Sequence, residues 1–175
     1  MQYILSLFTS FVSIFDTTVT LVEYVAPFPE QQQEWSVEYN IDPEIWCLAE
    51  NIYHESKGEP IEGKISVAKA TLNRVKSPNF PNTVCEVVYQ PSNNPNRPLA
   101  CAFSWTCAKI KPEIINFEKW DESAEIGAFM YYDLIKSDIQ AKHYVRCGIR
   151  RLWMIEMYQS KKVHNHCFYR KRSRS

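Results

Sequence analysis

The chain has 175 residues with 20 Lys/Arg against 20 Asp/Glu, and 45% of its residues are hydrophobic and 14% aromatic. This length and apolar content predict one compact domain with a sizeable core and exclude an intrinsically disordered chain. With 4 glycines against 10 prolines and neither an internal repeat nor a glycine-rich phosphate loop, the sequence favours helices joined by rigid loops.

The first 25 residues form an apolar segment with two interpretations. Residues 1–15 carry no charge, Asp16 follows, and no Lys or Arg supplies the positive start of a standard secretory signal. Residues 3–22 just reach the length of a membrane span, although they contain several Thr and Ser. One interpretation is a signal-anchor with weak membrane association, and the other is an element packed on the domain. Residues 26–40 are expected to be a linker into a catalytic domain at 41–170.

Two helices are expected at 42–57 and 60–76. Asp42 suits the N-cap of the first, and Pro43 suits its first helical position. Gly58 suits a left-handed residue that ends this helix, and Pro60 can open the next. The apolar stripe of the first helix is continued by one further step at Glu55.

Glu55 is the leading candidate for a catalytic residue. A carboxyl group on the apolar face of a helix is partly desolvated, which favours its neutral form and raises its pKa. A carboxylic acid that stays protonated near neutral pH can protonate the leaving oxygen of a glycosidic bond. Spacing alone leaves open a solvated glutamate near a helix end, because most glutamates lie at the surface.

Three blocks of sequence, together with a closing element, resemble one family. The blocks are YHESKGEPIEGKISVAKATLNRV, SPNFPNTVCEVVYQ and CAFSWTC, and the closing H-x-F-Y is matched by His166, Phe168 and Tyr169. In this order they resemble the cell wall hydrolases of the SleB/CwlJ type, the spore-cortex-lytic enzyme family, from about Cys47 to about Arg170. The resemblance implies cleavage of peptidoglycan glycan strands by hydrolysis or lytic transglycosylation. It also implies one catalytic glutamate, which the motif places at Glu55.

The chain departs from this family pattern at two places. Ser56-Lys57 stands where Ala-Arg is usual, and Ala102 stands where Gln usually precedes the Phe-Ser pair. Both places lie close to the presumed cleft, so they bear on substrate preference more than on the chemistry. They motivate the alternative of a peptidoglycan-binding module with weak or lost activity.

A second carboxylate separates two mechanisms. A two-carboxylate glycosidase needs it roughly 5 to 9 Å from the first. Glu59 is the candidate, and a helix-start acid that complements the dipole of the second helix is its alternative. Glu50 is expected to be solvated. A lytic transglycosylase, as the family resemblance implies, needs no second carboxylate, because one residue protonates the glycosidic oxygen and then takes a proton from the C6 hydroxyl of the sugar.

Further polar and aromatic side chains are candidates for lining a sugar cleft. In chain order, the candidates for substrate contact are Tyr53, His54, Glu59, Asn73, Tyr89, Gln90, Phe103, Ser104, Trp105, His143, His166 and Tyr169. Asn73 could hydrogen-bond Glu55 or its backbone. Phe103 and Trp105 could stack on a pyranose, with packing in the core as the alternative. Structural roles are the alternative for the two histidines of the expected strands.

The remaining pattern predicts a mainly α fold. Further helices are expected at 82–89, 121–138 and 148–159, and short strands at 141–146 and 165–170. Together these elements predict an α+β, lysozyme-like single domain with a small β hairpin, and the comparison with lysozyme is an analogy that the family implies.

Six cysteines permit disulfides in an exported protein, and they allow fifteen pairings. Pairing of Cys85 with Cys101 or Cys107 would brace the irregular loop at 90–100, whereas a reducing compartment would leave Cys47 a buried free thiol. The sequence has no C-x-x-C pair and no H-E-x-x-H helix, so neither a metal site nor a cofactor is expected.

Charge is distributed unevenly along the chain. Residues 136–175 hold 11 Lys/Arg against Asp138 and Glu156, a net charge of +9, and residues 1–135 therefore carry −9. The basic tail at 171–175 could approach an anionic polymer, with a solvated tail as the alternative. We expect peptidoglycan as the partner, no specific nucleic acid, a monomer, and a location in the cell envelope or outside the cell.

Overall fold

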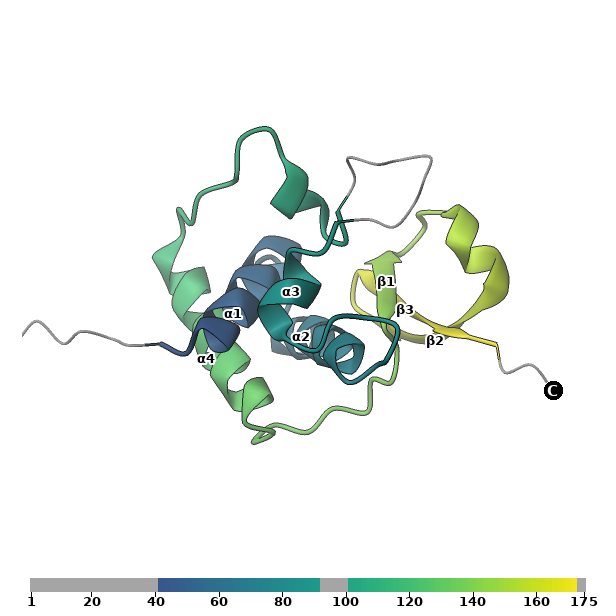
Figure 1. Cartoon of the computed structure of the whole chain (residues 1–175), viewed down its shortest axis with the longest axis horizontal. Coiled ribbons are helices and arrows are strands. Elements are labelled where there is room, and N and C mark those ends of the chain that lie inside the picture. The colour runs from purple at the N-terminus through teal and green to yellow at the C-terminus, as the bar shows by residue number, and fades with distance from the viewer. Residues whose placement is uncertain (1–40, 92–100, 173–175) are drawn as a thin grey trace, which may run out of the picture. The chain divides into compact units, whose positions relative to one another are not determined.

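The computed structural model describes residues 41–91 and 101–172. The predicted apolar segment 1–25 and linker 26–40, most of the loop 90–100 and the end of the basic tail lie outside these ranges. The described elements are α1 (Pro43–Ser56), α2 (Ile61–Val75), α3 (Val84–Val88), η1 (Ser104–Cys107), α4 (Phe117–Tyr131), β1 (His143–Arg146), η2 (Leu152–Glu156), β2 (Met157–Val163) and β3 (His166–Lys171). Figure 1 shows the α-helices gathered together, with the strands beyond the end of α2.

Helix α1 occupies the centre of the helical part. It begins at an Asp42 cap, whose carboxylate accepts a hydrogen bond from the Glu44 amide at 2.9 Å. Its apolar stripe places Leu48 and Ile52 in the core with no exposed surface, and the helix contacts α2, α3 and α4. Helix α4 approaches it closely at Gly127, where a Cβ atom would lie 3.4 Å from the Ala49 nitrogen. The burial of α1 fixes the position of the residues in its last turn.

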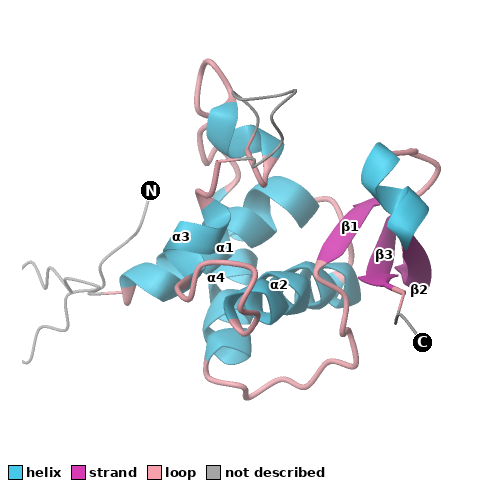
Figure 2. Ribbon diagram, turned by 45° about the vertical axis from the view of Figure 1, so that its right-hand side comes forward, coloured by secondary structure: helices cyan, strands magenta, loops and turns pink. Residues whose placement is uncertain are grey.

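The strands form one antiparallel sheet in the order β1-β3-β2 (Figure 2). Tyr144 pairs with Phe168, and His143 pairs with Tyr169. Because paired residues share a face, Tyr144 and Phe168 point to one side of the sheet and the other pair points to the opposite side. Phe168 has no exposed surface, so its face is the one that packs on the core.

The predicted mainly α fold with a small antiparallel β element is confirmed, and several predicted details are wrong. Residues 148–159 were expected to be helical, but only Leu152–Glu156 form a short 3₁₀ helix and the chain continues as β2. Pairing with β3 decides the conformation of this segment, against its helical pattern. The hairpin is therefore a three-stranded sheet.

The ends of two predicted helices also differ from the structure. Helix α4 begins at Phe117 because the Asn116 side chain caps it, accepting from the Lys119 amide at 2.9 Å, and it ends at Tyr131. The predicted helix had run from 121 to 138. The left-handed ending at Gly58 is wrong, because the only described glycine with positive φ is Gly148.

All six cysteines are paired, as Cys47–Cys85, Cys101–Cys107 and Cys147–Cys167. The first disulfide joins α1 to α3, and the third joins the turn after β1 to β3. Both the suggested pairing of Cys85 with Cys101 or Cys107 and the suggested free thiol at Cys47 are wrong. Within the described ranges, no helix has both the length and the hydropathy needed to cross a membrane.

Candidate active site

Glu55 lies in the last turn of α1, where this helix meets α2 and β1. Its side chain is half-buried, and the neighbouring Ser56 hydroxyl donates to the Ile52 carbonyl at 2.7 Å. Burial raises the pKa of Glu55, while the Arg74 guanidinium and a hydrogen bond from Tyr144 act in the opposite direction. The net shift is upward, which favours a protonated carboxyl group at higher pH than in a solvated glutamate.

Tyr144 of β1 provides the hydrogen bond to Glu55. Its hydroxyl lies 3.4 Å from the Glu55 Oε2 atom. Burial and the adjacent Glu55 charge raise the pKa of Tyr144 well above its ordinary value, so the phenol remains neutral and can donate. Its ring packs against His166 and Phe168 at centroid distances of 5.4 and 5.5 Å. The sheet therefore holds this donor in place beside the carboxyl group.

Arg74 provides the nearby positive charge from the end of α2. Only 7% of this residue is exposed, and its guanidinium lies over the Phe103 ring at 4.7 Å. Its Nε atom donates to the Lys142 carbonyl at 2.7 Å. The preceding Asn73 donates to the carbonyls of Ile139 and Ala141 at 2.8 and 3.1 Å. The L-N-R-V motif thus fastens the chain leading into β1, which positions Tyr144.

A buried amide supports the other side of α1. Asn51 donates to the Thr71 hydroxyl at 3.0 Å and accepts from the Trp105 indole at 3.3 Å. These contacts hold Trp105 against the His54 ring, at a centroid distance of 4.4 Å. Burial lowers the pKa of His54, so its imidazole is neutral near pH 7. His54 thus flanks Glu55 in the sequence but packs on the F-S-W-T segment.

Several candidates for substrate contact have structural roles instead. Tyr53 has no exposed surface, and its hydroxyl accepts from the amides of Ile115 and Asn116, which contradicts a role in binding substrate. Asn73 is occupied by the chain before β1 and makes no bond to Glu55. Phe103 and Trp105 are 3% and 7% exposed, which agrees with the core interpretation and leaves little surface for stacking on a sugar. Among this group, Ser104 is exposed.

Glu59 is held by the turn between β2 and β3. Its carboxylate accepts from the backbone and side-chain amides of Asn165, at 3.3 and 3.0 Å. Burial acts to raise its pKa, but these bonds outweigh burial and the net shift is downward. Gly63 makes room for this side chain, because a Cβ there would lie 2.7 Å from the Glu59 Cβ. Glu59 is therefore ionised and engaged in a structural contact.

Glu50 is buried, so the expectation that it is solvated is wrong. The hydroxyl of Tyr89 donates to its carboxylate, and Lys111 lies 3.1 Å from Oε1. The hydroxyl of Tyr89, a candidate for substrate contact, is therefore bonded to Glu50 and Lys111.

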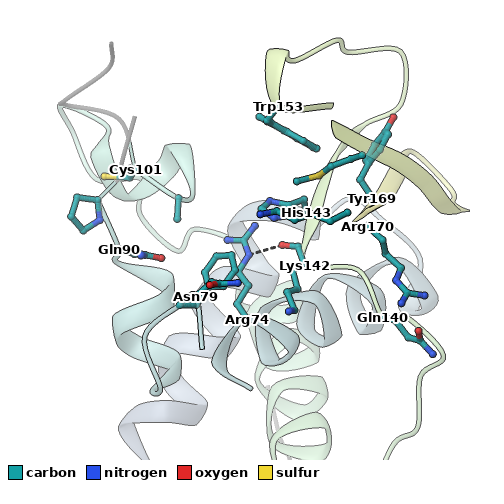
Figure 3. A pocket seen from close by; sticks show the side chains of 15 residues that line it. Arg74, Asn79, Gln90, Cys101, Gln140, Lys142, His143, Trp153, Tyr169 and Arg170 are labelled. Atoms are coloured by element: carbon teal, nitrogen blue, oxygen red, sulfur yellow. Dashed lines mark hydrogen bonds between the residues drawn. The ribbon is translucent and has the colours of Figure 1, made fainter. Parts of the chain in front are cut away.

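The remaining candidates lie around the sheet. His166 is buried behind Tyr144, whereas Gln90, His143 and Tyr169 line a cavity on the opposite face of the sheet (Figure 3). Glu55 does not line this cavity, although Arg74 lines it and also acts on Glu55. Sequence reasoning missed Arg74, although it lies within the quoted L-N-R-V block, and gave no role to Tyr144.

The family of the chain follows from a comparison with models of protein families. The model of the Cell Wall Hydrolase family matches residues 58–169, more than half of the sequence. The chain belongs to this family. The match begins three residues after Glu55, so the role of Glu55 depends on the geometry described above and on the sequence motif.

The Cell Wall Hydrolase relatives include spore cortex-lytic enzymes. Those of Bacillus subtilis and Bacillus cereus are 46% and 48% identical over 48 residues, which is 27% of this chain. The match covers only 16% and 18% of those relatives' own length.

Two solved structures share the fold. The catalytic domain of the Bacillus cereus SleB protein is 26% identical with a TM-score of 0.54, covering 73% of this chain and 89% of that domain. The catalytic domain of the germination-specific lytic transglycosylase SleB from Bacillus anthracis is 27% identical with a TM-score of 0.54, covering 77% and 100%. The described fold is therefore that of the SleB catalytic domain.

Proposed function

We propose that this protein cleaves the glycan strands of peptidoglycan, with Glu55 as the acid that protonates the glycosidic oxygen. The observation that carries this proposal is the partly desolvated Glu55 carboxyl group between Tyr144 and Arg74. Membership of the Cell Wall Hydrolase family supports peptidoglycan as the substrate. Three disulfides suit action outside the cytoplasm, in the cell envelope.

The surroundings of Glu55 suit both forms of a general acid, the protonated carboxyl group and the carboxylate. Burial favours the protonated carboxyl group that is needed when the bond to the leaving oxygen breaks. Once the proton has moved to that oxygen, the carboxylate is stabilised by the Tyr144 hydroxyl and the Arg74 charge. The same carboxylate can then accept a proton.

We infer that the proton returns from the C6 hydroxyl of the cleaved sugar. The C6 oxygen bonds to C1 as its proton moves to Glu55, which gives a 1,6-anhydro ring and restores the acid. The contacts of the other nearby acids support a single-carboxylate reaction, because Glu59 is bound to Asn165 and Glu50 to Tyr89 and Lys111. The Bacillus anthracis relative of this fold is a lytic transglycosylase, which agrees with this course.

The test is mass spectrometry of the fragments released from purified sacculi by the wild type, Glu55→Gln and Glu59→Gln. We expect Glu55→Gln to lower the rate by roughly 10²- to 10⁴-fold, because the amide cannot donate an acidic proton. Glu59→Gln is the matched control, and its rate should stay within about tenfold of the wild type.

The chemistry of the fragment ends separates the mechanisms. Anhydro ends from the wild type would support the single-carboxylate reaction, and reducing ends would mean that water attacks. A folded Glu55→Gln variant that releases fragments at the wild-type rate would exclude Glu55 as the acid. Binding to intact sacculi with no fragments from the wild type would support a binding module instead.

A further inference from the structure

A cavity of about 670 Å³ lies beside the sheet, on the face that carries His143 and Tyr169 (Figure 3). It extends from the end of α2 and the segment at 90–91 and 101–102 to the strands and η2. Figure 3 shows Arg74 and Lys142 at its centre, with His143, Trp153 and Tyr169 along the side of the sheet. None of the steps proposed for Glu55 uses this space.

The described lining of the cavity is cationic and contains no acidic residue. Four cationic residues contribute to the lining, namely Arg74, Lys142, Arg170 and Lys171. Lys171 lies on the cavity face of β3, whereas Arg170 leaves the strand on the face of Phe168 and lies at the cavity's edge. The Lys142 ammonium donates to the Ser77 hydroxyl at 2.8 Å. Arg74 uses Nε for the Lys142 carbonyl, and among the described residues no protein acceptor takes up its two terminal nitrogens. A buried guanidinium with free planar donors is suited to a carboxylate. The cavity is therefore built to receive negative charge.

An aromatic wall faces these cations. The Trp153 ring lies 5.4 Å from His143 and 5.6 Å from Tyr169, measured between centroids. Burial and the adjacent Arg74, Lys171 and Lys142 charges lower the pKa of His143 to about 4, so this ring is neutral near pH 7 and belongs to the apolar wall. Pockets of this kind bind the apolar part of a ligand on the rings and orient it through a few polar groups.

We propose that this cavity binds the carboxylates of the stem peptides carried by peptidoglycan strands, so that peptide-bearing strands are the favoured substrate. The inference rests on the proposed function for the identity of the polymer. Arg74 connects the two places, because it lines the cavity and its charge also acts on Glu55. In this proposal, an anionic group attached to a strand at Glu55 would be bound by Arg74 and by Lys171 on the cavity face of β3.

The test measures binding without turnover. All proteins carry Glu55→Gln, and calorimetry compares a disaccharide-tetrapeptide purified from sacculi with the same compound after its carboxylates are converted to methylamides. We expect binding of the intact compound to be about tenfold tighter. Arg170→Gln/Lys171→Gln should remove this preference, since it removes Lys171 from the cavity face of β3 and Arg170 from the cavity's edge.

A matched variant, Lys109→Gln/Lys162→Gln, controls for net charge. Both lysines are exposed, and neither lines the cavity. This variant should keep the tenfold preference. Equal affinity for the two compounds, or a preference that survives Arg170→Gln/Lys171→Gln, would overturn the proposal.

Cleavage kinetics on sacculi and binding of an oligonucleotide test the proposal further. On sacculi, Arg170→Gln/Lys171→Gln in the otherwise wild-type protein should raise KM about tenfold and leave kcat unchanged. Absence of cleavage by the wild type would count against the proposed function alone, because the calorimetry does not depend on turnover. Equally tight binding of a single-stranded oligonucleotide, lost in the same variant, would show a general anion surface and overturn the assignment to stem peptides.

Discussion

The acidity of Glu55 is set by opposing influences from its neighbours. Burial raises its pKa, and the Arg74 charge and the Tyr144 hydrogen bond lower it by favouring the carboxylate. A general acid acts in its protonated form, so kcat/KM should fall as the pH rises through the pKa of Glu55. The position of this alkaline limb reports the environment of one carboxyl group.

Tyr144→Phe should move the alkaline limb to higher pH. The substitution removes the hydrogen bond that favours the carboxylate, so Glu55 stays protonated over a wider range. The measurement is the pH profile of kcat/KM, with the exposed Tyr132→Phe as the control. A limb that stays in place or moves to lower pH would show that Tyr144 does not act on Glu55.

Glu55→Gln should stabilise the folded protein at alkaline pH. In the folded chain the pKa of Glu55 lies above its ordinary value of 4.5. Folding therefore favours the protonated carboxyl group, and the folded protein loses stability as the pH rises through the raised pKa and Glu55 ionises. Glutamine does not ionise and avoids this loss. Calorimetric melting should give a higher Tm than the wild type at pH 8 and a smaller difference below pH 4.5. A variant less stable than the wild type at pH 8 would contradict this explanation.

Within the candidate site, Glu55 is the residue that the sequence singles out. Its place on an apolar helical stripe is a local pattern within one element. The partners Arg74 and Tyr144 come from two other elements, and which charge or hydroxyl reaches the carboxyl group depends on tertiary packing. Glu50 shows the same limit, because its hydrogen-bond partners Tyr89 and Lys111 lie far along the chain.

At the scale of the elements, close packing of α4 on α1 depends on Gly127. A Cβ there would already be in van der Waals contact with α1, 3.4 Å from the Ala49 nitrogen and 3.6 Å from its Cβ, so the two further methyl groups of valine would crowd the helix. We expect Gly127→Val to lower the free energy of unfolding by about 1–3 kcal/mol. Gly58→Ala is the control, since no atom lies within 4 Å of a Cβ at that position, and it should be neutral or stabilising by up to about 1 kcal/mol. Urea unfolding measures both, and similar losses would refute the packing argument.

Helices α1 and α2 were predicted within one residue at each end, because helix-start residues and apolar periodicity are local signals. Strand β2 was missed for the opposite reason. Its residues are mostly exposed, and its conformation depends on pairing with β3 across a two-residue turn in which His164 has a φ of 47°. Neither the register nor the turn is visible in the residues of β2 alone.

At the scale of the whole molecule, the three disulfides add covalent links to the packing of a small core and thereby stabilise the fold. Loop-closure entropy predicts stabilisation of about 4 kcal/mol for Cys47–Cys85, about 3 kcal/mol for Cys147–Cys167 and about 2 kcal/mol for Cys101–Cys107. These follow from sequence separations of 38, 20 and 6 residues. Fifteen pairings were open to sequence reasoning because pairing is decided by the packing of α1 on α3 and of β1 on β3.

Full reduction of the protein should therefore unfold most of the molecule. A domain of this size is stable by roughly 5–15 kcal/mol, which is similar to the combined contribution of the three disulfides. Thermal unfolding followed by circular dichroism, with and without a phosphine reductant, should show a large fall in Tm and parallel loss of sacculus-cleaving activity. Removing only the short loop with Cys101→Ala/Cys107→Ala should cost least, and Cys47→Ala/Cys85→Ala most. An unchanged Tm after complete reduction would mean that the helical core alone sustains the fold.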